Sequence, residues 1–153
     1  MVSDTQNPDA DTGLEGFLCF ALYSANHAMN RVYKPLLEKL GLTYPQYLAM
    51  VVLWARDDQT VGELCEKLFL ESSTMTPLLK RLEKMGLVYR QRDPADERQV
   101  RISLTVEGRG MQKRTHRIPD CVLTASGLTG KALLHLNDQI TTLRENLSSA
   151  AAE

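Results

Sequence analysis

The chain has 153 residues, which suits one domain with a buried core, and its composition is that of an ordinary globular protein. Its 18 Lys and Arg against 19 Asp and Glu give a net charge of −1, which argues against a generally basic nucleic-acid binder. No apolar run is long enough for a membrane span, and the acidic start lacks the apolar core of a secretory signal. We therefore expect a disordered acidic tail over residues 1–13, one domain over residues 14–150, and a cytoplasmic protein without a membrane partner.

The basic residues are concentrated in one part of the chain. Residues 80–114 carry ten Lys and Arg against five Asp and Glu, whereas residues 1–79 carry five against ten. A local excess of positive charge of this kind is expected where a protein faces the phosphates of DNA.

Residues 14–40 are expected to form one long helix, kinked at Pro35 and followed by Gly41 as a helix-ending residue. Its apolar residues near a heptad spacing are Leu18, Leu22, Ala25, Met29, Val32, Leu36 and Leu40. Further apolar side chains lie outside this stripe, so more than one face must be buried, which indicates a subunit interface.

Two helices with recognisable starts come next. Thr43 with Gln46, and Thr60 with Glu63, each have the spacing of a capping box. The first box precedes an apolar, buried helix. The second precedes a short helix whose apolar stripe consists of Val61, Leu64, Cys65, Leu68 and Phe69.

The segment 72–86 predicts an amphipathic helix that Ser72 or Ser73 can cap. Its apolar stripe is Met75, Leu78, Leu79, Leu82 and Met85, and its polar side carries Ser73, Thr74, Thr76, Lys80, Arg81 and Lys84. Hydroxyls and cations bind phosphates and base edges, although an ordinary surface helix with a solvated basic face has the same pattern. The short helix before it favours a helix-turn-helix.

A hairpin is predicted after this helix. Residues 87–89 and 99–104 are short strands, and the loop RQRDPADER between them carries charges of both signs. The hairpin completes a winged helix over residues 44–104. An arginine at the loop tip could enter the minor groove of DNA, or the tip could be a solvated turn with a local Asp–Arg pair.

The remaining chain predicts two more helices within residues 105–150. Thr105 caps the first, which Gly108 and Gly110 weaken and Pro119 bends, and Thr129 caps the second. The second has a coiled-coil-like seam of Leu133, Leu136, Ile140, Leu143 and Leu147. The expected fold is therefore mainly α with a small β-wing, flanked by long dimerisation helices that would place two recognition helices about 34 Å apart.

The spacing of the three cysteines matches neither a metal-binding motif nor a dense disulfide framework. Cys65 falls on an apolar stripe and is interpreted as a core residue. Cys19 lies among aromatic residues, where burial would make it inert and hydroxyls bonded to its sulfur would make it reactive. Spacing leaves these alternatives open. His27, His116 and His135 are isolated, so we expect no metal and no cofactor, and a zinc-responsive regulator is a weak alternative.

Four motifs together resemble the MarR family, and within it the branch of organic hydroperoxide resistance regulators. They are LCFALYSA, VYKPLLEKLGLTYPQYLAMVVLW, STMTPLLKRLEKMGLV and DERQVRISLTVEG. The likeness runs from about Leu18 to Pro119. It implies a non-enzymatic, homodimeric winged-helix repressor that binds a palindromic operator in double-stranded DNA.

The resemblance also implies roles for individual residues. Cys19 would be the peroxide-oxidised sensor, with Tyr33 and Tyr44 hydrogen-bonded to its sulfur. Cys121 would be the resolving cysteine of the partner subunit, unless a small-molecule thiol takes that part. The implied DNA contacts are Ser72, Thr74, Thr76, Lys80 and Arg81 in the recognition helix, and Arg98, held by Asp96, at the wing tip. Glu71 and Phe69 depart from the Asp and Tyr expected at their positions.

The sequence is also compatible with two functions other than peroxide sensing. Many relatives release DNA when a small aromatic acid binds between the dimer helices and the winged domain, without oxidation. A thiol peroxidase that turns over at Cys19 is the enzymatic alternative, but the sequence lacks a cysteine with a nearby Thr and Arg of the peroxidase kind, and a basic wing would serve no purpose in such an enzyme.

Overall fold

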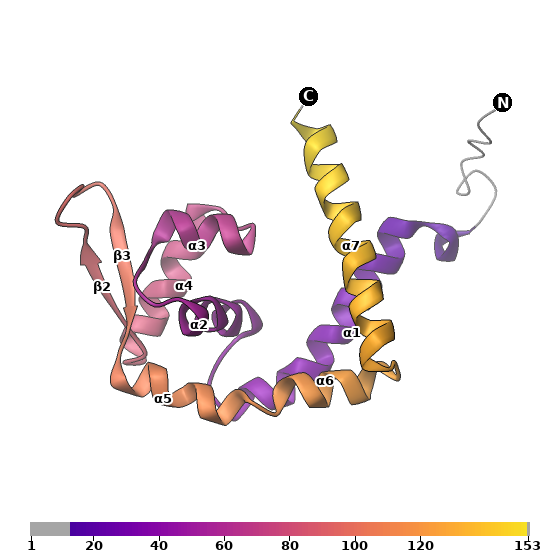
Figure 1. Cartoon of the computed structure of the whole chain (residues 1–153), viewed down its shortest axis with the longest axis horizontal. Helices are drawn as coiled ribbons and strands as arrows, with labels where there is room; N and C mark the ends of the chain where they lie inside the picture. The colour runs from indigo at the N-terminus through magenta and orange to yellow at the C-terminus, as the bar shows by residue number, and fades with distance from the viewer. Residues whose placement is uncertain (1–12, 153) are drawn as a thin grey trace. The chain divides into compact units, whose positions relative to one another are not determined.

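The computed structural model describes residues 13–152, which form two compact units, one ending at Lys113 and the other beginning at Arg114. The predicted acidic tail lies outside the described residues except for Gly13. In chain order the elements are η1 (Leu14–Gly16), α1 (Leu18–Glu38), α2 (Tyr44–Ala55), β1 (Gln59–Thr60), α3 (Val61–Leu68), α4 (Ser72–Lys84), β2 (Val88–Arg92), β3 (Val100–Leu104), α5 (Val106–Thr115), α6 (Ile118–Ser126) and α7 (Gly130–Ala151). The mainly α fold with a small β-wing is confirmed (Figure 1).

The first predicted helix is divided in the structure. Phe17 has an extended backbone, with φ −79° and ψ 123°, and it separates the short 3-10 helix η1 from α1. Pro35 lies inside α1, and Gly41 takes the left-handed conformation, with φ +70°, in the turn before α2. One continuous helix over residues 14–40 is therefore wrong at its start.

Both capping boxes are confirmed. The Thr43 side chain accepts a hydrogen bond from the backbone N–H of Gln46, and the Gln46 side chain accepts one from the N–H of Thr43. Thr60 and Glu63 make the same reciprocal pair at the start of α3. These pairs satisfy free N–H groups and fix where α2 and α3 begin.

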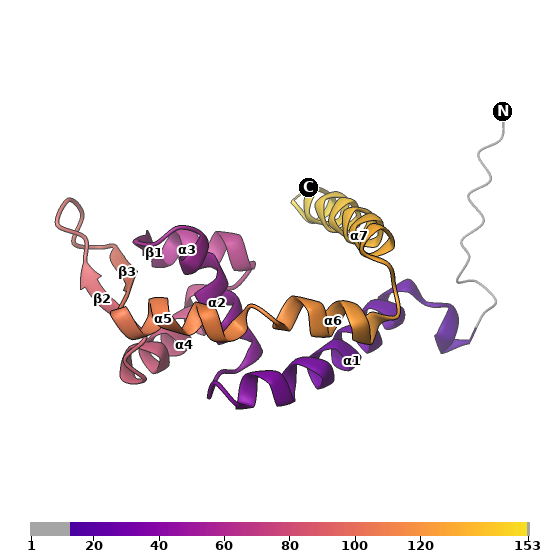
Figure 2. The same cartoon turned by 60° about the horizontal axis from the view of Figure 1, so that its bottom comes forward.

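The wing belongs to a three-stranded antiparallel sheet in the order β1-β3-β2, so the predicted two-stranded ribbon is incomplete. The short strand β1 was missed, and it pairs Gln59 with Ile102 (Figure 2). The longer hairpin pairs Val88 with Leu104 and Arg92 with Val100. β2 also contacts α4, so the sheet and the helix-turn-helix share one core.

The core of the first unit is built from side chains of α2, α3, α4 and the sheet. Its fully enclosed apolar members are Ala49, Met50, Leu53, Leu64, Met75, Leu79, Leu82 and Ile102. They include Met75, Leu79 and Leu82 of the apolar stripe predicted for α4, so this side of the helix packs against the core and the opposite side faces solvent.

The predicted helix after Thr105 is two helices, α5 and α6, and Pro119 lies in the first turn of α6 rather than at a bend. A proline is tolerated there because the first N–H groups of a helix have no partner. The caps are confirmed, because Thr105 accepts from the N–H of Gly108 and Thr129 from that of Ala132. None of the helices in residues 13–152 is both long and apolar enough to cross a membrane.

Candidate functional site

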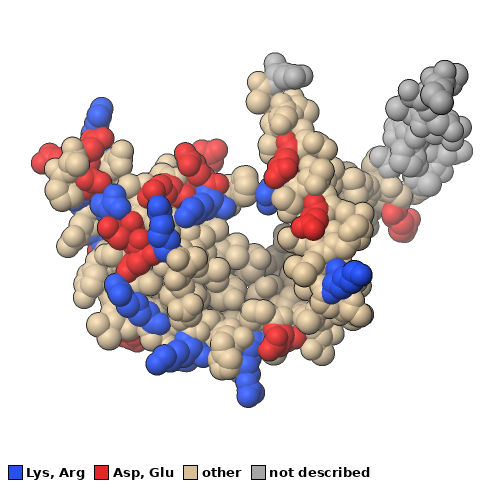
Figure 3. All heavy atoms as spheres, viewed as in Figure 1, with Lys and Arg blue, Asp and Glu red and all other residues tan. Residues whose placement is uncertain are grey.

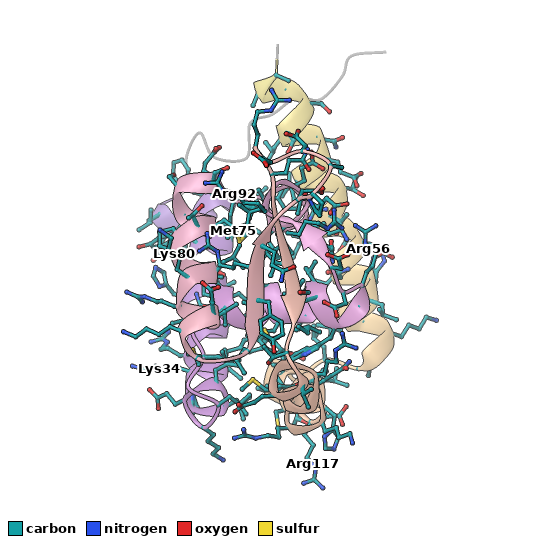
Figure 4. The ribbon with its side chains drawn as sticks, turned by 90° about the vertical axis from the view of Figure 1, so that its left-hand side faces the viewer. Lys34, Arg56, Met75, Lys80, Arg92 and Arg117 are labelled. Carbon is teal, nitrogen blue, oxygen red and sulfur yellow. The ribbon has the colours of Figure 1, made fainter. Side chains whose placement is uncertain are left out.

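Helix α4 presents a polar surface to solvent. Met75 and Leu79 are fully buried against the core, whereas Lys80 lies on the other side of the helix (Figure 4). Of the predicted DNA contacts on this helix, Ser72, Ser73, Thr74, Lys80 and Arg81 are exposed and Thr76 is half-buried. The helix therefore offers hydroxyls in its first half and cations in its second half, as a recognition helix requires.

The start of α4 differs from the prediction. The N-cap residue is Glu71, whose side chain makes no cap hydrogen bond, and Ser72 is the first helical residue. Ser72 and Ser73 are thus not caps, and both residues are exposed on the surface. Met85 lies beyond the last turn and is 37% exposed, so it is not part of the buried stripe.

The wing tip is an ordered turn. The backbone N–H of Gln99 donates to the carbonyl of Asp96 at 2.9 Å. Arg98 donates from its backbone N–H and from its side-chain Nε to the Asp96 carboxylate, both at 3.1 Å. The Arg98 side chain is nevertheless 91% exposed. Basic and acidic side chains are interspersed over this part of the surface (Figure 3).

We predict that Arg98→Ala lowers DNA affinity at least tenfold, since an arginine inserted in a narrow minor groove contributes more than about 1.4 kcal/mol. The free energy of unfolding should change by less than about 0.5 kcal/mol, because the side chain is exposed. Fluorescence anisotropy with a labelled duplex and urea unfolding measure the two quantities. The neighbouring Glu97→Gln is the control, and equal affinities for both variants would exclude a role for the wing tip.

The base of the wing is held by a three-residue ion cluster that sequence reasoning missed. Arg101 on β3 donates to the Asp58 carboxylate at 2.8 Å, to the Asp58 carbonyl at 2.8 Å and to the Asp93 carboxylate at 3.1 Å. These bonds raise the pKa of the Arg101 guanidinium. The pKa of Asp93 is lowered, mainly by the hydrogen bond from the Ala95 N–H and next by the bond from Arg101. The Arg101 guanidinium and the Asp93 carboxylate therefore both stay charged. The cluster ties the wing to the loop after α2.

Two predicted sensor residues meet in the structure. Tyr33 on α1 and Tyr44 on α2 have ring centroids 4.8 Å apart, and Tyr47 lies 6.0 Å from Tyr33. Tyr33 and Tyr44 line a pocket of about 840 Å³ between α1 and α2. The apolar part of its wall consists of Leu37, Leu42, Pro45, Leu48, Leu68 and Leu70.

Burial keeps these phenols neutral. Desolvation, together with the neighbouring Tyr44 and Tyr47, raises the pKa of Tyr33 from 10.0 to about 12. Burial also raises the pKa of Tyr44. A phenol that stays protonated remains a hydrogen-bond donor, so the pocket wall offers donors to an oxygen or sulfur atom inside it.

This pKa shift gives a prediction for alkaline stability. The folded state prefers neutral Tyr33, so the resulting stabilisation is fully present below pH 10 and is lost as the pH rises through about 12. Free energies of unfolding measured from pH 8 to 12 should fall less steeply for Tyr33→Phe than for the wild-type chain. A Tyr89→Phe variant, at an exposed position on β2, should follow the wild-type profile. Identical profiles for all three proteins would contradict the prediction.

The three cysteines lie at different sites and are all free thiols. Cys19 is exposed in the first turn of α1, and Cys121 is exposed on α6. Cys65 is half-buried, unlike the core residue expected, and its Sγ lies 3.9 Å from the Ser72 hydroxyl. Phe69, predicted on the apolar stripe of α3, is not part of that helix, because α3 ends at Leu68 and Phe69 takes the left-handed conformation with φ +54°. Its side chain is 65% exposed.

Cys19 and Tyr33 do not meet within one chain. They are 14 residues apart on the continuous helix α1, and a rise of 1.5 Å per residue separates them by about 21 Å along its axis. A contact between the Cys19 sulfur and the Tyr33 hydroxyl therefore requires two chains. Within the described residues, no three His, Cys, Asp or Glu side chains are grouped so that they could hold a metal ion.

A helix-turn-helix followed by a wing, with a hydroxyl- and cation-bearing second helix, defines a winged-helix DNA-binding protein. The sequence model of the SarA/Rot family of transcriptional regulators matches residues 31–114 of this chain. The organic hydroperoxide resistance transcriptional regulator of Bacillus subtilis is 46% identical over 134 residues, which cover 88% of this chain and 91% of that protein. The chain belongs to this MarR-type family of winged-helix transcriptional regulators and is a DNA-binding transcriptional regulator, which confirms the resemblance and the prediction of a regulator rather than an enzyme.

Solved structures agree with this assignment. Reduced AbfR bound to DNA is 32% identical, with a TM-score of 0.72, and the match covers 85% of this chain and 91% of that one. Disulfide-formed AbfR is 31% identical, with a TM-score of 0.59, over 89% and 90% of the two chains. AbfR is a protein of Staphylococcus epidermidis.

Proposed function

We propose that this protein is a homodimeric repressor that senses organic hydroperoxides through oxidation of Cys19 and then releases its operator. The observation that carries the proposal is the pair of protonated phenols, Tyr33 and Tyr44, on the wall of an apolar pocket. The identity to an organic hydroperoxide resistance regulator supports the same signal, and AbfR provides a relative with reduced DNA-bound and disulfide forms.

Exposed apolar surfaces on the flanking helices support the dimer. On α1, Leu18 is 55% exposed and Tyr23 is 63% exposed. On α7, which has no buried residue, Leu134, Leu136, Ile140 and Leu147 are all exposed. Such surfaces favour association with a second copy, because burying them removes apolar area from water. The dimer also supplies the second chain that a Cys19–Tyr33 contact needs.

The proposed chemistry starts from the Cys19 thiolate. Its position in the first turn of α1, where helix N–H groups point outward, suits an anion, and α1 has no acidic residue in that turn. The thiolate attacks the terminal oxygen of the hydroperoxide and breaks the O–O bond. The sulfur becomes a sulfenic acid, and the departing alkoxide takes a proton to leave as an alcohol. Phenol donors from Tyr33 and Tyr44 of the second chain would hydrogen-bond the sulfur.

A second thiol completes the oxidation. Attack on the sulfenic acid releases water and leaves a disulfide. Cys121 of the partner chain is the proposed resolving thiol, since it is exposed on α6, and a small-molecule thiol is the other source. The apolar leucine wall favours an organic hydroperoxide over hydrogen peroxide, which is small and polar.

Operator release would follow from a change in spacing. A two-fold dimer presents two α4 helices to successive major grooves, about 34 Å apart on a palindromic site. A disulfide between chains would move the flanking helices and change that spacing. Contacts to several phosphates would then be lost together, which lowers affinity steeply.

The test is an anisotropy titration of the reduced protein on a duplex taken from upstream of its own gene. Binding should be lost on addition of an organic hydroperoxide and return after a thiol reductant. Binding that persists through the oxidant would contradict the sensing proposal while leaving DNA binding intact.

The same pocket supports a second candidate signal. A volume of about 840 Å³ with an apolar wall and two phenols also suits a small aromatic acid. Release of the duplex by such an acid, with reductant present throughout, would favour this function over oxidation.

A further inference from the structure

A groove of about 790 Å³ separates the first half of α4 from the wing. Ser72 and Thr76 line it from α4, Arg90, Arg98 and Arg101 line it from the wing, and Glu63 and Glu66 line it from α3. Hydroxyls therefore face arginines across the groove, while carboxylates close the end beside α3.

Arg90 points into the space between β2 and α4. It pairs with Ile102 across the hairpin, and opposite residues of an antiparallel pair share one face. Because Ile102 is fully buried, the Arg90 side chain lies on the inner face. Its Nη1 is 3.5 Å from the Glu83 carboxylate of α4. Its Nε is the one buried side-chain nitrogen or oxygen without a hydrogen-bond partner among residues 13–152.

The geometry of winged-helix docking places a DNA strand in this groove. A recognition helix in the major groove and a wing in the adjacent minor groove lie on opposite sides of one sugar-phosphate backbone. That backbone must therefore pass between α4 and the wing. The Arg90 guanidinium lines this groove from the inner face of the wing, so it lies where the backbone phosphates would pass.

We propose that Arg90 binds a backbone phosphate of the DNA strand that passes between α4 and the wing. This rests on the DNA binding of the family and adds a residue to the proposed interface. The other two arginines that line the groove are engaged elsewhere, because Arg101 is bonded to Asp58 and Asp93 at the wing base and Arg98 is bonded to Asp96 at the tip. In the free protein Glu83 holds Arg90, and a phosphate replaces part of that ion pair.

Salt dependence distinguishes this role from a purely structural one. The reduced protein is titrated by anisotropy, at several salt concentrations, on the upstream duplex and on an unrelated duplex of equal length. Arg90→Gln should weaken binding roughly tenfold on both duplexes, since a charge-assisted bond is lost. It should also make the slope of log affinity against log salt less negative by about 0.9 for each bound chain. Arg90→Lys should retain the slope.

Glu83→Gln is the matched variant, because it removes the partner of Arg90 and keeps the side-chain shape. If Arg90 binds phosphate, Glu83→Gln tightens DNA binding, since a carboxylate near the backbone is lost. If Arg90 only braces the wing against α4, both variants weaken binding and neither changes the salt slope, which overturns the proposal. A wild-type slope for Arg90→Gln also overturns it. These measurements contain no peroxide, so failure of the sensing proposal would not affect them.

Discussion

A Cys19→Ser variant is expected to bind the operator duplex as tightly as the wild-type protein and to remain bound when an organic hydroperoxide is added. Serine is close in size to cysteine, and residue 19 is exposed on α1, which is not part of the helix-turn-helix or the wing. A hydroxyl, however, cannot become a sulfenic acid. The expected difference is large, because the wild-type protein should lose most of its affinity, whereas the variant should lose none. Anisotropy with and without oxidant measures both.

The other two cysteines provide matched controls for this result. Cys65→Ser should respond to peroxide as the wild-type protein does, since its sulfur lies beside Ser72 and not in the proposed sensor. Cys121→Ser should still be oxidised at residue 19, but it should form no disulfide between chains on a non-reducing gel. Release of DNA by Cys19→Ser on peroxide treatment would exclude Cys19 as the sensor.

Local features of the chain were predictable because short-range chemistry determines them. A capping box needs only two side chains three residues apart, and both Thr43 with Gln46 and Thr60 with Glu63 form as expected. The stripe of α4 was also predictable, since burial of Met75 and Leu79 follows from helical spacing. These features sufficed to predict the helix-turn-helix and the wing.

Features that depend on residues far apart in the chain were missed. The strand β1 contains two residues and exists only because β3, some forty residues later, pairs with it. The bond from Arg101 to Asp58 joins residues 43 positions apart, and no sequence pattern marks it.

The proposed sensor shows the same limit. Tyr33 and Tyr44 were expected near Cys19, and the structure brings the two phenols together but leaves Cys19 about 21 Å along α1 from Tyr33. Sequence spacing alone could not separate contacts within a chain from contacts between chains. Helix geometry does so, since a straight helix fixes the distance between its own residues. The sensing proposal therefore requires the dimer.

Gly108 and Gly110 on α5 give the second large prediction, because they are two residues apart on one helix and have opposite surroundings. A Cβ at Gly108 would lie 2.0 Å from the carbonyl oxygen of Leu87, whereas a Cβ at Gly110 would have nothing within 4 Å. The Leu87 carbonyl accepts the N–H of Thr105, and Gly108 itself accepts the Trp54 indole N–H at 2.8 Å. Close backbone approach at Gly108 thus holds α5 against the first residues of the wing.

Gly108→Ala is therefore expected to lower the free energy of unfolding by about 3 kcal/mol, because backbone must move and the Trp54 and Thr105 bonds weaken with it. Gly110→Ala should instead raise it by roughly 0.5–1 kcal/mol, since alanine favours the helix and meets open space. Urea unfolding of the reduced proteins, all at the same protein concentration and followed by the fluorescence of Trp54, measures both changes. Fluorescence should also show a more exposed indole in folded Gly108→Ala. If the free energies of unfolding of the two variants differ by less than about 0.5 kcal/mol, the backbone of α5 does not approach Leu87 closely. The proposed role of this contact in positioning the wing would then be wrong.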